Sequence, residues 1–308
     1  MKHSTQSALA LLASLLAVSL IVSALRQRRL VGPPRRAPSS IRVGFVGNSF
    51  TYYNDLPGLL ERATGLACDA CTRGGASLAS LLRDGGDNTG HAALRLAKAA
   101  LARAPWAEAL STKRAQRLVD ASKDVPTRWD LRAFLGDAQR DVVVVQDFSR
   151  GPIKSRDEGV GALRRLAPLL REARVVVLFS TWAYDNALTR ADDDLRDTTK
   201  MARGLAEGYE EYARALRDAG VESMAIAPVG AAFELVRAGD EARWRSLFAR
   251  DGYHPSPAGT YLAARVLHLT ISTALDRETE ITWDGDDGPA DLADAARKAS
   301  EASSMGML

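Results

Sequence analysis

A serine follows the apolar run at residues 41–46, in the segment Gly47-Asn48-Ser49-Phe50-Thr51. A hydroxyl at such a strand-to-helix turn is exposed, and the backbone amide beside it can donate to a ligand. The residue type and its position indicate a nucleophile. A Gly-Asn-Ser sequence is also common in ordinary turns, so this segment alone leaves both interpretations open.

A histidine that could activate this serine lies near the other end of the chain, in Asp251-Gly252-Tyr253-His254-Pro255. An acid three residues before an imidazole can fix its tautomer and stabilise its protonated form, as a serine nucleophile requires. The alternative is a turn that only caps the next helix. Of the other histidines outside the N-terminal segment, His268 lies among apolar residues and is expected to pack, whereas His91 follows a Gly/Asn-rich loop and is either a solvated loop residue or a substrate contact.

Two further segments follow apolar runs and are candidates for contacts with a ligand. Gln146-Asp147-Phe148-Ser149-Arg150 comes directly after four valines and could supply hydrogen-bond donors, or could be a solvated loop. Trp182 and Tyr184 follow the next run, where aromatic rings either line a sugar-binding cleft or close the edge of the core.

Five short apolar runs, of which the second is the weakest, are expected to be the strands that position these segments. Amphipathic helices alternate with them, which predicts a three-layer α/β fold with a mostly parallel five-stranded sheet. Ligands bind beyond the carboxyl ends of such strands, where the polar segments lie. The predicted strands cover residues 41–46, 65–72, 141–146, 174–180 and 221–228, and the predicted helices cover 56–64, 159–173, 191–219 and 256–274.

The sequence also predicts regions outside this core. Residues 1–25 are expected to be a signal peptide or membrane anchor, followed by a basic, Pro-rich linker over 26–40. The folded domain is expected to span 41–278, with a helical insertion at 84–128 that is longer than a normal crossover. Residues 279–308 are expected to be an acidic tail with a loose helix and a frayed end.

The charge distribution excludes a general nucleic-acid binder. The net charge is +3, but six of the 41 basic residues lie in the first 40 residues, which contain no acid. This leaves 35 bases against 38 acids in the rest, a mildly acidic body. We expect an extracytoplasmic protein, secreted or anchored, that contacts a membrane only through its N-terminal segment. Basic residues on both sides of the apolar run leave open whether it is cleaved and which side the domain faces.

Motifs for other chemistries are missing from the sequence. It contains no HExxH, P-loop or strand-linked GxGxxG pattern, so zinc proteases, P-loop NTPases and Rossmann dehydrogenases have no support. Cys68 and Cys71 form a CxxC pair inside a predicted strand, which favours two apolar cysteines or a local disulfide over a redox or zinc site. No metal or organic cofactor is expected.

Four segments, in this order, resemble the blocks of the SGNH (GDSL-like) hydrolases. They are GNSFT at 47–51, Gly74-Gly75 after the second strand, the polar cluster at 146–150 and DGYHPSPAGTYLAA at 251–264. More narrowly, the chain resembles the branch whose first block reads GNSFT and whose third block contains Gln. The segments STWAY at 180–184 and APVGAA at 227–232 also resemble that branch. The resemblance covers roughly residues 41–275 and implies a flavodoxin-like strand order.

The resemblance also implies roles for individual residues. Ser49 would be the nucleophile, His254 the general base and then the acid, and Asp251 the residue that orients His254. The oxyanion hole would use the amides of Ser49 and Gly75, with Gly74 as an alternative, and a side-chain amide from the third block. This chain lacks the usual Gly-x-Asn-Asp of that block, so Gln146 is the candidate donor and Ser149 its substitute. Further candidates for substrate contacts are Asn48, Ser149, Trp182 and His91.

These features together predict a serine esterase that removes acyl groups, with acetyl as the favoured group and a carbohydrate as the favoured substrate. The carbohydrate follows from the resemblance and the predicted export. Two alternatives stay open: an O-acyltransferase that uses the same site with a sugar hydroxyl as acceptor, and a non-catalytic glycan-binding domain of the same fold. The second alternative would be favoured if the serine and the histidine lay too far apart for a hydrogen bond.

Overall fold

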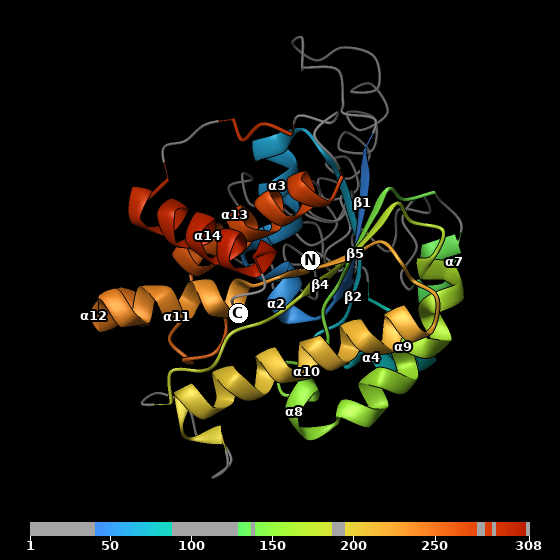
Figure 1. Cartoon of the computed structure of the whole chain (residues 1–308), viewed down its shortest axis with the longest axis horizontal. Coiled ribbons are helices and arrows are strands. Elements are labelled where there is room, and N and C mark those ends of the chain that lie inside the picture. Colours follow the sequence, from blue (N-terminus) through green and yellow to red (C-terminus); the bar gives the residue numbers. More distant parts are fainter. Residues whose placement is uncertain are drawn as a thin grey trace, which may run out of the picture. The chain divides into compact units, whose positions relative to one another are not determined.

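Five parallel strands form the sheet that the apolar runs predicted (Figure 1). In the computed structural model their order is β2-β1-β3-β4-β5, and every neighbouring pair runs in the same direction. This is the flavodoxin-like order, in which the direction of winding reverses between β1 and β3 and ligands bind beside that point. The strands are β1 (Arg42–Gly47), β2 (Ala67–Thr72), β3 (Val142–Val145), β4 (Val175–Phe179) and β5 (Met224–Ala227).

The structure describes residues 41–87, 129–136, 139–186, 195–275, 281–284 and 288–305. All of them belong to one compact unit of the chain, which comprises 39–90 and 128–308. The predicted N-terminal segment, the linker, most of the predicted insertion and His91 lie outside the described residues. Among the helices that are described, none is both long and apolar enough to cross a membrane.

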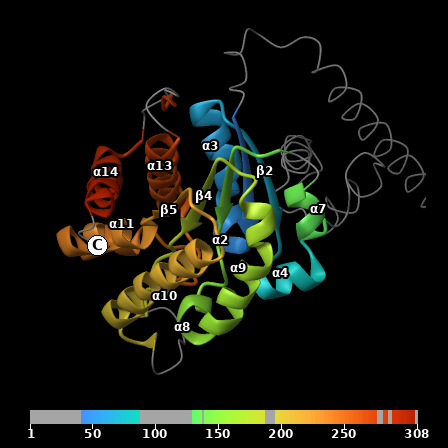
Figure 2. The ribbon, with the colours of Figure 1, turned by 45° about the vertical axis from the view of Figure 1, so that its right-hand side comes forward.

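Helices cover both faces of the sheet and give the three predicted layers (Figure 2). Alternate residues of a strand point to opposite faces, so Val142 and Val144 pack in one core and Val143 and Val145 in the other. The first core is closed by α3 (Leu56–Thr64), α11 (Val229–Gly239), α13 (Pro257–Ala274) and α14 (Ala290–Ser304). The second is closed by α4 (Leu78–Asp84), α7 (Leu131–Gly136), α9 (Arg156–Leu170) and α10 (Thr198–Asp218).

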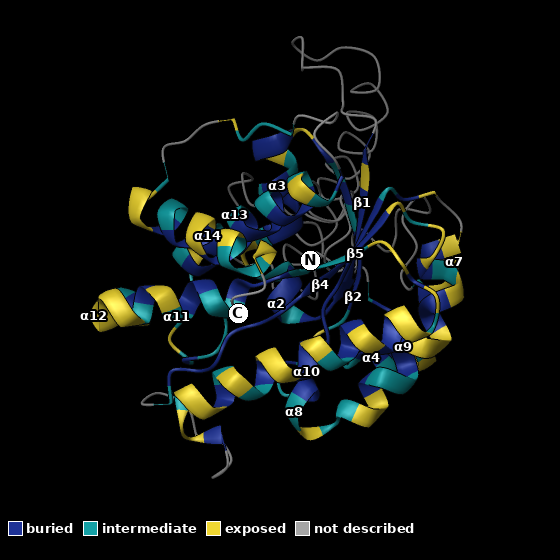
Figure 3. Ribbon diagram, in the orientation of Figure 1, coloured by how far each residue is buried: buried dark blue, intermediate teal, exposed yellow. Residues whose placement is uncertain are grey.

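The long helix α10 shows the amphipathic pattern that its sequence predicted. One stripe faces the sheet and is buried, while the opposite stripe is exposed (Figure 3). Its predicted start at residue 191 is wrong, because the helix begins at Thr198. The side chain of Asp197 accepts the amide hydrogen of Lys200 and so caps the helix there.

The helix predicted in the acidic C-terminal segment is present, but it is packed against the domain and not loose. Leu292, Ala295, Ala296 and Ala299 of α14 are all buried in the same core as α11 and α13. Their spacing of three and four residues places them on one face of the helix. Asp291, in the first turn, forms an ion pair with Arg243 at 2.6 Å. The domain therefore extends past residue 278 to the end of α14.

The two cysteines of the CxxC pair are free and buried in strand β2. Burial raises the pKa of the Cys71 thiol to about 12, so it stays protonated and unreactive. This agrees with the interpretation of the pair as apolar residues. Within the described ranges, no group of three or more His, Cys, Asp or Glu side chains is arranged to hold a metal ion.

Candidate active site

Ser49 is the first residue of α2 (Ser49–Tyr52), a one-turn helix that begins directly after β1. Asn48 caps this helix, since its Oδ1 atom accepts the amide hydrogen of Phe50 at 3.0 Å. The turn places the Ser49 side chain at the carboxyl edge of the sheet, where it is partly exposed. This is the position that the sequence predicted for a nucleophile.

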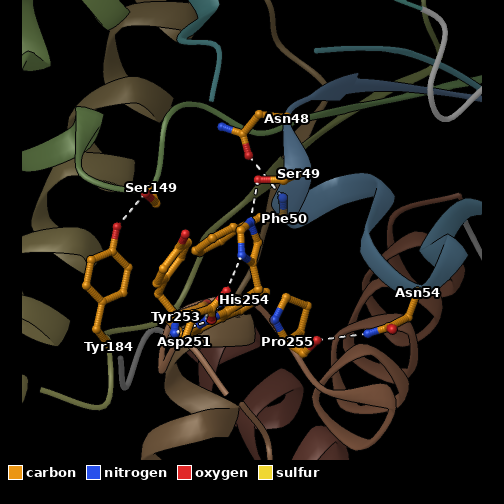
Figure 4. Close-up of polar contacts among 11 residues, drawn as sticks. Asn48, Ser49, Phe50, Asn54, Ser149, Tyr184, Asp251, Tyr253, His254 and Pro255 are labelled. Carbon is orange, nitrogen blue, oxygen red and sulfur yellow. Dashed lines mark hydrogen bonds and ion pairs between the residues drawn. The ribbon is translucent and has the colours of Figure 1, made fainter. Parts of the chain in front are cut away.

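The Asp251–His254 turn brings an imidazole to this serine from 205 residues away in the sequence (Figure 4). The Nε2 atom of His254 lies 2.8 Å from Ser49 Oγ, and its Nδ1 atom lies 2.7 Å from Asp251 Oδ2. The turn closes through Gly252, whose φ of 76° lies in the left-handed region that glycine adopts without strain. The structure therefore arranges the three predicted residues in the order acid, base, nucleophile.

The carboxylate of Asp251 is held by more than the imidazole. Its Oδ1 atom accepts the amide hydrogens of Tyr253 and His254 at 3.1 and 3.0 Å. Partial burial raises the pKa of Asp251, but the bonds from the side chain and amide of His254 and from the Tyr253 amide outweigh it and hold the pKa below the ordinary value. Asp251 thus stays ionised at neutral pH and orients the histidine as an acceptor.

Three aromatic rings fix the plane of the His254 imidazole. Tyr53 stacks on it almost in parallel, with ring centroids 4.5 Å apart and an angle of 8° between planes. The centroid of the Tyr253 ring lies 4.3 Å from that of the imidazole in a tilted arrangement. The Phe50 ring makes an edge contact, with its centroid 5.7 Å from that of the imidazole. These contacts hold the imidazole in the orientation in which it lies between Asp251 and Ser49.

Two backbone amides beside the serine are suited to bind a developing negative charge. The amides of Ser49 and Gly75 donate to no acceptor among the described residues, and both residues line the same pocket. Gly75 lies in the turn between β2 and α4 with a φ of 67°, a conformation that favours glycine. Gly74 also lines the pocket.

The predicted role of Gln146 as an oxyanion donor is wrong in this structure. The side chain is fully buried and does not line the pocket. Its Oε1 atom accepts the Asn48 amide and the Thr51 hydroxyl, each at 2.9 Å, and its Nε2 atom donates to the carbonyl of Asp147. Every polar atom of the side chain is engaged inside the protein, because the end of β3 faces the loop after β1 and not the pocket.

Gln146 belongs to a buried polar cluster, which we define as Asn48, Gln146 and Asp147. The Nδ2 atom of Asn48 donates to the carbonyls of Ala76 and Asp147, at 2.9 and 3.4 Å. Asp147 Oδ1 accepts the amides of Leu78 and Phe148, at 2.8 and 2.7 Å, and its Oδ2 accepts the Tyr212 hydroxyl at 2.6 Å. The cluster therefore ties the serine turn and the Gly75 turn to the end of β3. Asn48 lines the pocket, although both polar atoms of its side chain are engaged within the protein, so its predicted substrate contact stays a prediction.

The remaining predicted contacts divide between the pocket and the core. Ser149 lines the pocket, and its hydroxyl lies 2.6 Å from that of Tyr184, which lines it too. Trp182 is fully buried and stacks between Phe50 and Phe233, with centroid distances of 4.7 and 4.6 Å. It closes the core and does not line the pocket, so its predicted substrate contact is wrong.

The pocket in front of Ser49 has a volume of about 750 Å³. Its walls include residues that the sequence analysis did not single out, namely Tyr52, Tyr53 and Tyr253. Their only sequence signal is that each lies within four residues of Ser49 or His254. Adjacency to a predicted catalytic residue would have found them, since a turn that exposes one side chain exposes its neighbours.

Comparisons with known proteins find similarity of structure. No protein-family model matches the sequence, and no curated protein matches it. The chain is similar to a solved structure from Slackia heliotrinireducens that is provisionally described as an SGNH hydrolase, with 25% identity and a TM-score of 0.49, covering 76% of this chain and 100% of that one. It is also similar to a DUF4886 family protein from Bacteroides uniformis, with 20% identity and a TM-score of 0.54, covering 87% of this chain and 96% of that one. The second likeness supports the observed α/β fold.

Proposed function

We propose that this protein is a serine esterase of the SGNH type that hydrolyses acyl esters, with acetyl as the acyl group and a carbohydrate as the alcohol. We place it in the branch with a GNSFT first block and Gln in the third. The observation that carries the proposal is the pair of hydrogen bonds that joins Asp251, His254 and Ser49 in front of a pocket. The distance of 2.8 Å between Ser49 Oγ and His254 Nε2 is within hydrogen-bond reach and so supports a catalytic role over a non-catalytic one.

The reaction follows from what each group can donate and accept. As Ser49 Oγ attacks the ester carbonyl, its proton passes to His254 Nε2, which lies within hydrogen-bond reach. The bond to the alcohol then breaks, and His254 returns the proton to the leaving oxygen, which gives an acyl-serine and a free alcohol. Water, activated by the same nitrogen, releases the acid and restores the serine.

The negative charge of each tetrahedral intermediate needs donors at the carbonyl oxygen. The amides of Ser49 and Gly75 are suited to this role, because both reach the pocket and the buried polar cluster holds both turns. Removing one such donor in other enzymes lowers the rate by about 10²–10³-fold. A donor carried by rigid backbone costs no reorganisation as the charge develops.

Hydrolysis of 4-nitrophenyl acetate by the full chain tests the proposal. The parent is expected to turn over, and Ser49→Ala is expected to lower kcat by at least about 10³-fold. Ser304→Ala, an exposed serine at the end of α14, is the matched control and should retain the parent rate. Equal rates in the parent and Ser49→Ala would overturn the assignment of the nucleophile. A folded parent without activity would favour the non-catalytic alternative, and transfer to an added sugar would favour the acyltransferase.

A further inference from the structure

The bond between Ser49 and His254 joins two segments that are far apart in the chain. Ser49 follows β1, whereas His254 lies between α12 (Glu241–Arg245) and α13. A displacement of about 1 Å between catalytic groups can lower a rate by about 10²-fold. The distance of 2.8 Å between Ser49 Oγ and His254 Nε2 therefore requires contacts that hold the two segments together.

Asn54 makes such a contact (Figure 4). Its Nδ2 atom donates to the carbonyl of Pro255, the residue after His254, at 2.8 Å, and to the Thr260 hydroxyl on α13 at 2.9 Å. Both hydrogens of the side-chain amide are thus directed at the segment that carries the histidine. Asn54 itself lies five residues after Ser49, and α2 fills most of that interval, so the connection to the nucleophile is short.

The backbone at Asn54 is held in a conformation that non-glycine residues seldom adopt. Asn54 and Asp55 have φ values of 51° and 58°, and among the described residues they are the only two non-glycine residues with a positive φ. Asparagine and aspartate tolerate this region better than other residues with a Cβ atom, but it still costs conformational energy. Such a conformation persists where surrounding contacts outweigh its cost, and the two bonds of the Asn54 side chain are contacts of this kind.

Other bonds hold the histidine turn toward a different part of the fold. The carbonyl of Tyr253 accepts the Trp182 indole hydrogen at 3.0 Å, and that of Gly252 accepts a backbone amide hydrogen from the loop after β4 at 2.8 Å. These bonds fix the turn relative to β4. The bond from Asn54 fixes it relative to the segment that carries Ser49.

We propose that Asn54 is a positioning residue, which keeps the His254 imidazole within hydrogen-bond distance of Ser49 Oγ. Asn54 does not line the pocket, so it acts through the histidine turn and takes no part in proton transfer. The effect on the rate rests on the proposed esterase function, whereas the effect on the distance between the two side chains can be measured without it.

Two substitutions of Asn54 separate the side chain from the backbone that carries it. Asn54→Gly adopts the positive φ without strain and loses both bonds, whereas Asn54→Ala loses both bonds and keeps the strain. With 4-nitrophenyl acetate and the full chain, kcat should fall by about 10–10²-fold in both variants, with KM within about twofold of the parent value. Asn54→Ala should unfold at a lower urea concentration than Asn54→Gly. Equal losses of kcat at unequal stability would assign the effect to the two bonds and not to unfolding.

Thr260→Val is the matched control, because it keeps the buried volume and removes one acceptor of Asn54 but leaves the bond to the Pro255 carbonyl. Its kcat should stay within about threefold of the parent value, although its stability falls, since a buried donor loses its partner. A kcat in Asn54→Gly within about threefold of that of an active parent overturns the inference but not the proposed esterase. A fall in Thr260→Val as large as in Asn54→Gly also overturns it, because the anchor on α13 would then govern the rate and not the bond to the turn.

Crystal structures of the parent and of Asn54→Gly decide the inference without an assay. We expect the distance between Ser49 Oγ and His254 Nε2 to exceed about 3.5 Å in the variant, beyond a hydrogen bond, and to remain close to 2.8 Å in the parent. A parent that is folded but inactive would overturn the proposed esterase and leave this measurement valid. A distance in Asn54→Gly equal to the parent's overturns the inference, whatever the rates.

Discussion

Two groups of polar residues lie at the carboxyl edge of the sheet and differ in what they do. The buried polar cluster after β1 and β3 directs every hydrogen bond inward, to neighbouring turns and to α10. The Asp251–His254 turn is partly exposed and directs its bonds along one line to Ser49. The first group sets the position of the site, and the second carries its chemistry.

The two groups also differ in the direction in which the pKa of their aspartate, Asp147 or Asp251, is shifted. Burial raises the pKa of Asp147 above the ordinary value, even though the Tyr212 hydroxyl and the Leu78 and Phe148 amides act against it. Asp251, which is less buried, has a lowered pKa because its hydrogen bonds prevail. A buried acid that bonds to neutral donors holds loops together, whereas a more exposed acid bonded to an imidazole remains charged and can stabilise a proton there.

The largest contrast between the groups is expected for His254→Ala. Removing the base should lower kcat for 4-nitrophenyl acetate by about 10⁴-fold or more, since serine and base act as a unit. The free energy of unfolding in urea should lie within about 1 kcal/mol of the parent's, because only a partly exposed side chain is lost. A variant that also lost several kcal/mol would place His254 in the scaffold, against the distinction drawn here.

Gln146→Met is expected to have the opposite profile. Methionine has a similar size but cannot accept the Asn48 amide and the Thr51 hydroxyl, so the free energy of unfolding should fall by about 1–3 kcal/mol. Thr51→Val, which leaves the Asn48 bond in place, is the control and should cost less. The measurement is urea unfolding beside kcat. A fall in kcat of about 10²–10³-fold at unchanged stability would instead restore Gln146 as the oxyanion donor that its sequence position suggested.

Much of the fold could be predicted because its signals are local. Runs of consecutive valines marked β3 and β4 as strands buried on both faces, and Ser256 with Pro257 marked the start of α13. Helix α14 was predicted only as a loose helix, because its buried stripe consists mainly of alanines, which look alike on a packed and a solvated face. The stripe is buried because α11 and α13 pack in the same core, and only the fold brings them beside it.

The site was predictable where chemistry depends on residue type and spacing, and less so where it depends on direction. Ser49, Asp251 and His254 were identified because few combinations of residues at such positions can act together. The side chain of Gln146 also follows a strand, but the sequence does not say toward which neighbour it points. The same holds for Trp182, whose ring stacks in the core while Tyr184, two residues later, reaches the pocket.

The smallest effect is expected in the pH dependence of stability for Asp251→Asn. Because the pKa of Asp251 is lowered in the folded protein, its carboxylate contributes stability above the unfolded value of about 3.9 and loses that contribution as the pH falls through the folded value. The parent should therefore be more stable than the variant at pH 7, and the difference should shrink below about pH 4. Urea unfolding at a series of pH values measures it, with Asp218→Asn as the control for loss of an exposed carboxylate. A difference that grew in acid would mean that the pKa of Asp251 is raised in the folded protein, as that of Asp147 is, and that the two groups are not distinct.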